Sequence, residues 1–178
     1  ENEGDNALKF YAEKFDNQSL ESIEVSKEEI TEAINLVDEE VKIAINTAKN
    51  NIEKFHQSQK EIPQKIETTE GVVCWRESRA IDKVGLYIPG GTAPLFSTVL
   101  MLAVPAQIAG CKEIILCSPP QKNGKINPII LYVANLCRVS KIFKVGGAQA
   151  IAAMSLGTET VPKVYKIFGP GNQFVTEA

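Results

Sequence analysis

The sequence predicts an α/β protein in which a mostly parallel sheet is covered by helices on both faces and is preceded by an amino-terminal helical region. Three observations support this fold class. Apolar residues recur at helical spacing through the first third of the chain, short apolar strands alternate with helices from residue 84 onward, and three strand-to-helix junctions are rich in glycine. We expect a helical region over residues 1–66 and an α/β region over residues 67–178.

Two helices are expected in the first 37 residues. Leu8, Tyr11 and Phe15 are spaced so that they share one face of a first helix. Ser26 precedes Glu29 by three residues, which is the spacing of a capping box, where each side chain accepts a hydrogen bond from the other residue's backbone N–H. A second helix should therefore begin after Ser26 and end near Val37.

A third, longer helix is expected over residues 38–59. It carries a single apolar stripe, formed by Val41, Ile45, Ala48, Ile52 and Phe55. The stripe spans barely two heptads, which favours packing on another helix or on a neighbouring subunit over a coiled coil.

The pattern changes at Pro63, where β-rich segments begin. Residues 72–75 and 84–88 are expected strands on either side of a polar bend. Further strands are expected at 113–117, 141–145 and 163–168, and helices at 94–108, 127–136, 149–156 and from about residue 172. Strands that alternate with helices predict a mostly parallel, Rossmann-like sheet, because parallel neighbours need a crossover connection.

Glycine occupies each of three junctions between an expected strand and the following helix. We name these the first, second and third glycine turns: residues 87–94, 145–149 and 168–172. In a parallel sheet all three lie at the carboxyl edge, where ligands of open α/β sheets bind. Glycine lets a ligand approach the backbone, and the helix that follows directs free N–H groups toward a phosphate. Each turn also carries one side chain able to make a directed contact: Tyr87, Gln149 and Asn172.

These turns do not by themselves establish a dinucleotide site. Tight strand-to-helix turns use glycine for conformational reasons alone. No G-x-G-x-x-G sequence follows a strand, and the strand at 113–117 continues into Ser118 and Pro119 with no acid to hold a ribose. From the residues alone, we expect an α/β domain and favour a nucleotide or a phosphate as its ligand.

Composition argues against several classes of partner. The 178 residues are 44% hydrophobic and 23% charged, with a net charge of −3 and no cluster of Lys and Arg, so we expect no nucleic acid partner. The most apolar stretch, residues 95–109, is interrupted by Pro105 and Gln107, so we expect no membrane partner. The four cysteines form no CxxC pair, which favours free thiols and a cytoplasmic location.

Longer strings of residues resemble a known family. They are VGLYIPGG at 84–91, APLFSTVLM at 93–101, LCSPP at 116–120, VGGAQAIAA at 145–153 and IFGPGNQFVTEA at 167–178. Together with residues 51–56 in the helical part, they are similar in sequence to the histidinol dehydrogenases. The resemblance covers essentially the whole chain.

This resemblance implies an enzyme of histidine biosynthesis. The family oxidises L-histidinol to L-histidine through L-histidinal, in two successive steps that each reduce one NAD, and its members are zinc-dependent homodimers. The family's NAD contacts correspond to Tyr87, Gln149 and Asn172. The expected roles are packing against the cofactor for Tyr87 and hydrogen bonding to it for the two amides.

The resemblance also implies that this chain lacks the groups that perform the chemistry. The family's proton-transferring glutamate–histidine pair, its zinc ligands and most of its substrate contacts follow the position that matches Ala178. We therefore expect a cofactor-side fragment that is inactive alone, without a catalytic residue or a zinc ligand. His56 has no metal-binding partners nearby in sequence. Cys117 lies at a strand end, yet no base or cation beside it would activate the thiol, which favours a packing role.

Two other functions remain open. The glycine turns would equally suit a nucleotide- or phosphate-binding module without redox chemistry. The helix over residues 38–59 would suit an interaction protein in which the sheet is only a scaffold. NAD-dependent oxidation of histidinol distinguishes the enzyme from both.

Overall fold

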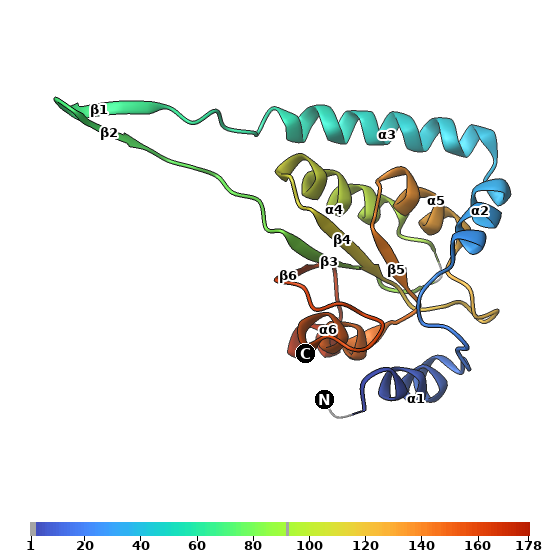
Figure 1. The fold of residues 1–178 in the computed structure, drawn as a ribbon. Helices are drawn as coiled ribbons and strands as arrows, with labels where there is room; N and C mark the ends of the chain where they lie inside the picture. The colour runs from blue at the N-terminus through green and yellow to red at the C-terminus, as the bar shows by residue number, and fades with distance from the viewer. Residues whose placement is uncertain (1–2, 92) are drawn as a thin grey trace.

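The centre of the molecule is a four-stranded parallel sheet. A computed structural model describes residues 3–91 and 93–178 (Figure 1). The strand order is β5-β4-β3-β6, and every pairing in this sheet is parallel, as predicted. The strands are β3 (Lys83–Tyr87), β4 (Glu113–Cys117), β5 (Lys141–Phe143) and β6 (Lys166–Phe168). The last two strands are shorter than the sequence suggested.

Helices cover both faces of this sheet (Figure 1). One face carries α2 (Lys27–Leu36), α3 (Glu39–Gln57), α4 (Phe96–Ala109) and α5 (Pro128–Leu136). The opposite face carries α1 (Gly4–Asp16) and α6 (Gly147–Leu156), and α7 (Gln173–Glu177) follows β6. Within residues 3–91 and 93–178, no helix has both the length and the apolar character needed to cross a bilayer.

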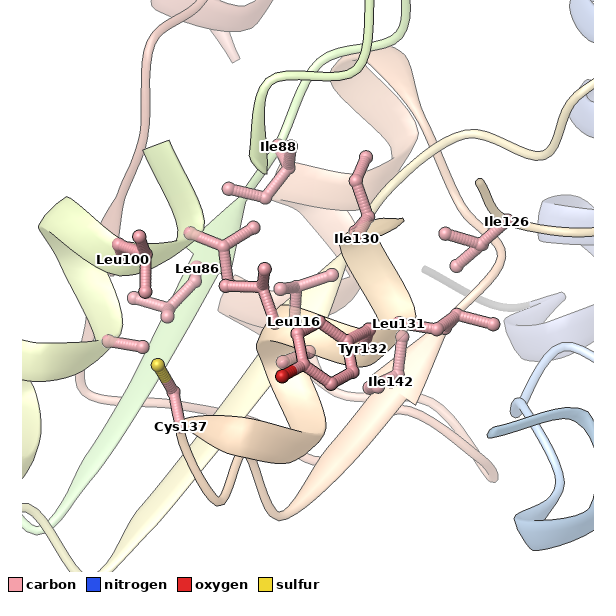
Figure 2. Close-up of a cluster of buried hydrophobic side chains, with 14 of the residues drawn as sticks. Leu86, Ile88, Leu100, Leu116, Ile126, Ile130, Leu131, Tyr132, Cys137 and Ile142 are labelled. Carbon is pink, nitrogen blue, oxygen red and sulfur yellow. The ribbon is translucent and has the colours of Figure 1, made fainter. Parts of the chain in front are cut away.

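Successive side chains along each strand point to opposite faces of the sheet, and this divides the core into two clusters. Leu86 and Leu116 point to the face of α4 and α5, where the larger cluster forms (Figure 2). Their neighbours in sequence, Tyr87 and Ile115, point to the face of α1 and α6 and join the smaller cluster. All four are buried, and each buried side chain of this size stabilises the fold by roughly 1.5–3 kcal/mol.

The helical region follows the sequence prediction closely, with three helices at the expected places. The capping box at the start of α2 is confirmed, with Ser26 Oγ 3.2 Å from the Glu29 nitrogen. In α1, however, Leu8 and Ala12 are buried, whereas Tyr11 and Phe15 are 39% and 62% exposed. Ala12 lets α1 lie close to its neighbours, and the two aromatic rings stack on each other outside the contact, 5.7 Å apart.

The apolar stripe of α3 packs on α4 of the same chain. Ile45 is buried at its centre, and Val41, Ala48 and Ile52 are partly buried against the same cluster. Phe55, near the end of the helix, is 62% exposed. Most of the stripe therefore serves the core of this chain rather than an outside partner.

A two-stranded hairpin projects from the rest of the molecule (Figure 1). Strands β1 (Lys65–Thr69) and β2 (Val72–Trp75) pair antiparallel and join no other strand of the described residues. The sequence predicted β2 but not β1 or the hairpin, because every residue of both strands is exposed and neither shows a buried face. The expected boundary at residues 66 and 67 falls within β1, and the division into two regions remains a prediction.

Candidate functional site at the carboxyl edge of the sheet

The strand order changes direction next to β3. Strands β3, β4 and β5 are added successively toward one edge, and α6 then returns the chain so that β6 pairs with the other side of β3. Open α/β sheets bind ligands at such a switch point, beyond the carboxyl ends of the strands. The first and third glycine turns follow β3 and β6, so both border this point.

Contacts connect all three glycine turns. The hydroxyl of Tyr87 accepts a hydrogen bond from the backbone N–H of Gly147, in the second turn, at 3.0 Å. Gly169, in the third turn, lies so close to the backbone carbonyl of Tyr87 that no side chain fits there. Tyr87 thus holds the second and third turns against the first.

The first glycine turn borders an open cleft of about 130 Å³, which the segments after β4 and before α5 also line. Pro119 in this cleft packs closely on Gly90, whereas Gly91 faces open space. Thr92, in the middle of the turn, lies outside the described residues. Among the described residues other than its chain neighbours, none would contact a side chain placed at Gly91, so this part of the backbone is open to an incoming ligand.

Tyr87 itself is buried. It is 4% exposed and belongs to the smaller core cluster. Burial raises the pKa of its hydroxyl above the usual value; the Gly147 N–H opposes this shift, while Asp16 and Cys117 add to it. The phenol is therefore neutral at physiological pH and acts here as the hydrogen-bond acceptor that fixes the second turn.

Gln149 lies in the first turn of α6. Its amide oxygen folds back over Gly147, within 2.7 Å of where a side chain would begin, and Gly147 has a φ of +63°, which favours glycine. Gln149 also lines a groove between α1 and α6 together with Tyr11. The start of α6 receives no hydrogen bond from a capping side chain at Gly146. The Gly147 N–H is bound by the Tyr87 hydroxyl, which leaves the N–H groups of Ala148 and Gln149 for a ligand.

Asn172 lies on the surface at the start of α7. Its side-chain oxygen accepts hydrogen bonds from the N–H groups of Phe174 at 3.1 Å and Val175 at 3.2 Å, and so caps the helix. The structure brings Tyr87 and Gln149 together through Gly147. Asn172 stands apart from this pair: within the described part of the chain, no hydrogen bond joins it to either residue.

Asp16, which the sequence did not indicate, lies next to this site. It is the last residue of α1, and its Oδ2 is the one buried side-chain nitrogen or oxygen atom of the described residues without a hydrogen-bond partner. Burial raises the pKa of its carboxyl group. Only the packing of α1 brings this residue to the sheet, so no motif could have predicted it.

The remaining candidates have structural roles. Cys117 is fully buried in the smaller cluster, and burial raises the pKa of its thiol far above the usual range, which supports the predicted packing role. His56 makes a local hydrogen bond to Gln59. Among residues 3–91 and 93–178, no three His, Cys, Asp or Glu side chains are grouped so that they could hold a metal ion.

Comparison with known proteins extends the resemblance found in the sequence. A family model for histidinol dehydrogenase matches residues 1–178. The chain is 64% identical over 176 residues to a histidinol dehydrogenase from Bacteroides thetaiotaomicron, and 60% identical over 175 residues to one from Mannheimia succiniciproducens. These alignments cover 99% and 98% of this chain, but 41% and 40% of the relatives.

A solved structure agrees with these matches. The crystal structure of histidinol dehydrogenase from Elizabethkingia anophelis superposes with a TM-score of 0.96 at 62% identity, covering 99% of this chain and 41% of that one. The chain therefore spans about two fifths of the length of the relatives that it matches. Sequence and fold agree along its whole length, and the chain belongs to the histidinol dehydrogenase family.

Proposed function

We propose that this chain forms the NAD-binding side of an enzyme that oxidises L-histidinol to L-histidine through L-histidinal. The observation that carries the proposal is the convergence of the glycine turns on Tyr87, at the switch point between β3 and β6. When bound, NAD accepts a hydride in each of the two oxidations. The residues of this chain would bind and orient it.

The available groups suit a dinucleotide. The open backbone at Gly91 lets a pyrophosphate approach the first turn, and α4, which follows this turn, begins without a capping side chain at Leu95. Gln149 in the second turn and Asn172 in the third each carry an amide, and the Tyr87 hydroxyl fixes the second turn. We propose all three as residues of the cofactor site, Gln149 and Asn172 through direct contacts and Tyr87 as a support beneath the site, because its side chain is buried.

The proposal includes zinc as a cofactor of the whole enzyme, L-histidinol as its substrate and a cytoplasmic location. The described residues do not fit a zinc site, so we assign no zinc ligand and no zinc-dependent step to them. The four cysteines are free thiols, which suits a reducing compartment. The activity belongs to the complete enzyme, and we expect residues 1–178 alone to be inactive.

A direct assay tests the proposal. NADH formation should be followed with L-histidinol, NAD and zinc, using the protein that carries this chain, and its Gln149→Ala and Asn172→Ala variants. We expect two NADH per histidinol, and a rise in KM for NAD of about tenfold in each variant, since each loses a hydrogen bond. NAD binding without histidinol oxidation would instead support the nucleotide-binding module.

We also propose a homodimer. The hairpin exposes Ile66, Val72, Val73 and Trp75, each by 47% to 59%, on an arm that projects from the molecule. Exposed apolar side chains gathered on one element indicate a contact surface. Sedimentation equilibrium of the protein measures its mass, and a monomer at micromolar concentration would contradict this part of the proposal.

A further inference from the structure

We propose that Asp16 is the acid that recognises the adenosine ribose of the cofactor, and that it selects NAD over its 2′-phosphorylated form. This inference rests on the proposed function, because it requires that a dinucleotide binds at the carboxyl edge. It adds a contact from α1, an element that does not belong to the strand–turn–helix units of the sheet.

The first step is the direction of α1. At its amino end, the Asp5 carboxylate accepts hydrogen bonds from both side chains of Thr158 and Thr160, and the Asp5 N–H donates to Glu159 Oε2 at 2.8 Å. Residues 158–160 directly follow α6. The start of α1 therefore lies at the end of α6. Tyr11 and Phe15, further along α1, line a groove with Gln149 at the start of α6, so the two helices run antiparallel.

The second step is the position of Asp16. Because α1 is antiparallel to α6, its last residue lies near the first turn of α6, which contains Gly147 and Gln149. Leu8, Ala12 and Asp16 are four residues apart and share one face of α1. Leu8 and Ala12 are buried, and Leu8 packs in the cluster that contains Tyr87. The charge of Asp16 contributes to raising the pKa of the Tyr87 hydroxyl, which accepts the hydrogen bond from Gly147, so the carboxylate lies near the second glycine turn.

The third step is the unpaired oxygen. A buried acceptor without a donor is costly, and an anion at a helix carboxyl end also meets the negative end of the helix dipole. No ammonium or guanidinium group lowers the pKa of Asp16; burial alone shifts it, upward. A residue that is unfavourable for stability, next to a binding site, is typical of a group that a ligand satisfies.

The fourth step is the chemistry of the ligand. Of the groups in a dinucleotide, the riboses, the adenine amine and the nicotinamide amide can donate hydrogen bonds, whereas the pyrophosphate would repel a carboxylate. The adenosine ribose is the group that dinucleotide-binding sheets pair with an acid. Dinucleotide-binding sheets commonly use an acid after the second strand for this contact, and here that position holds Ser118 and Pro119 instead. Asp16 supplies the missing acid from a different element. A phosphate on the 2′-hydroxyl would remove the donor and add a repelling charge.

The test measures the affinities of the protein that carries this chain for NAD and for NADP by calorimetry, in wild type, Asp16→Ala and Asp16→Asn. We expect Asp16→Ala to weaken NAD binding about tenfold, as for the loss of a hydrogen bond to a charged group. Asp16→Asn removes the charge but keeps the size, and should reduce the preference for NAD over NADP about tenfold. Both variants should unfold at a higher temperature than wild type.

Asp82→Asn is the matched control, because Asp82 lies just before β3 at the opposite edge of the sheet and pairs with Lys112 at 3.0 Å. It should leave both affinities unchanged. Asp16 variants that keep the wild-type affinity for NAD and the wild-type preference over NADP would overturn the inference while leaving the proposed function intact. If the wild-type protein binds no NAD, the proposed function fails, and the inference fails with it.

Discussion

At the scale of single residues, Tyr87 shows how one side chain organises the site. Its backbone lies against Gly169 and its hydroxyl accepts the hydrogen bond from Gly147, so it contacts two glycine turns and belongs to another. Its ring is part of the core. The same residue thus links the stability of the sheet to the shape of the carboxyl edge.

Tyr87→Phe should keep this packing but leave the partly buried N–H of Gly147 without its acceptor. The free energy of unfolding should fall by about 1–3 kcal/mol, which is the usual cost of an unsatisfied donor. Urea titration measures the change. Tyr165→Phe is the control, because Tyr165 is 71% exposed and its variant should unfold like wild type. Equal stability of wild type and Tyr87→Phe would mean that the hydrogen bond contributes nothing.

Asp16 should make stability depend on pH in a specific direction. Its pKa in the folded state lies above the ordinary value of 3.8, so the folded protein holds this proton more tightly than the unfolded chain does. The folded state therefore loses stability as pH rises from below 3.8 through the folded pKa. Tyr87, the titratable neighbour that Asp16 influences, stays neutral over this range.

The melting temperatures of Asp16→Asn and wild type should accordingly converge near pH 3 and separate toward pH 7, with the variant about 2 °C higher at neutral pH. Thermal unfolding followed by circular dichroism measures both curves. A variant that is less stable than wild type at neutral pH would show that the carboxylate has a partner within the protein, and would argue against a role in ligand binding.

At the scale of elements, the position of α1 depends on a cluster of hydrogen bonds at its amino end. Asp5, Thr158, Glu159 and Thr160 bind one another there, and the hydrogen bonds from the two threonines hold the pKa of Asp5 below its usual value even though burial opposes this shift. Elsewhere α1 buries little more than Leu8 and Ala12. These hydrogen bonds around Asp5 should therefore decide whether α1 stays packed on the sheet and keeps Asp16 in place.

Asp5→Ala should release the start of α1. Amide hydrogen exchange in residues 4–16 should become at least about tenfold faster, since a weakened local contact lowers the free energy of local opening. The affinity for NAD should fall with it, through the displacement of Asp16. Exchange in α4 provides the internal control and should not change. Unaltered exchange in α1 would show that the two buried apolar residues alone fix the helix.

At the scale of the whole molecule, the hairpin differs from the rest of the chain. Both of its strands are exposed throughout, so neither can contribute to the core of this chain. A two-stranded hairpin is at best marginally stable in water without further packing. The proposed dimer provides that packing.

Trp75→Ser should weaken the dimer about tenfold or more, because a large aromatic side chain is lost from the proposed contact. The dissociation constant is measured by sedimentation equilibrium, and melting of the sheet domain should change little. Phe168→Ser is a suitable comparison, since Phe168 is 38% exposed on β6, away from the hairpin. A Trp75→Ser protein with the wild-type dissociation constant would exclude this face of the hairpin from the interface.

The elements that the sequence predicted well are those whose signal is local. Strand β4 and the capping box of α2 were found at the expected residues, because a run of apolar residues and the spacing of Ser26 and Glu29 are readable without knowing the neighbours. The parallel order followed from the alternation of strands and helices. The helix α1 was also predicted, but the shared face of Leu8, Tyr11 and Phe15 did not show which residues are buried, because only tertiary packing decides which apolar side chains face inward.

The sequence by itself determined the family, the two-faced α/β architecture and the three glycine turns, because each is encoded in residues that lie close together along the chain. Tertiary structure alone decided that β6 returns beside β3, that Tyr87 is buried beneath the turns and that Asp16 comes from 130 residues before Gly146 to lie near α6. The physical reason is the distance along the chain over which the interactions act. Backbone preferences act between near neighbours, whereas an antiparallel helix or a buried, unpaired carboxylate exists only after distant segments have packed.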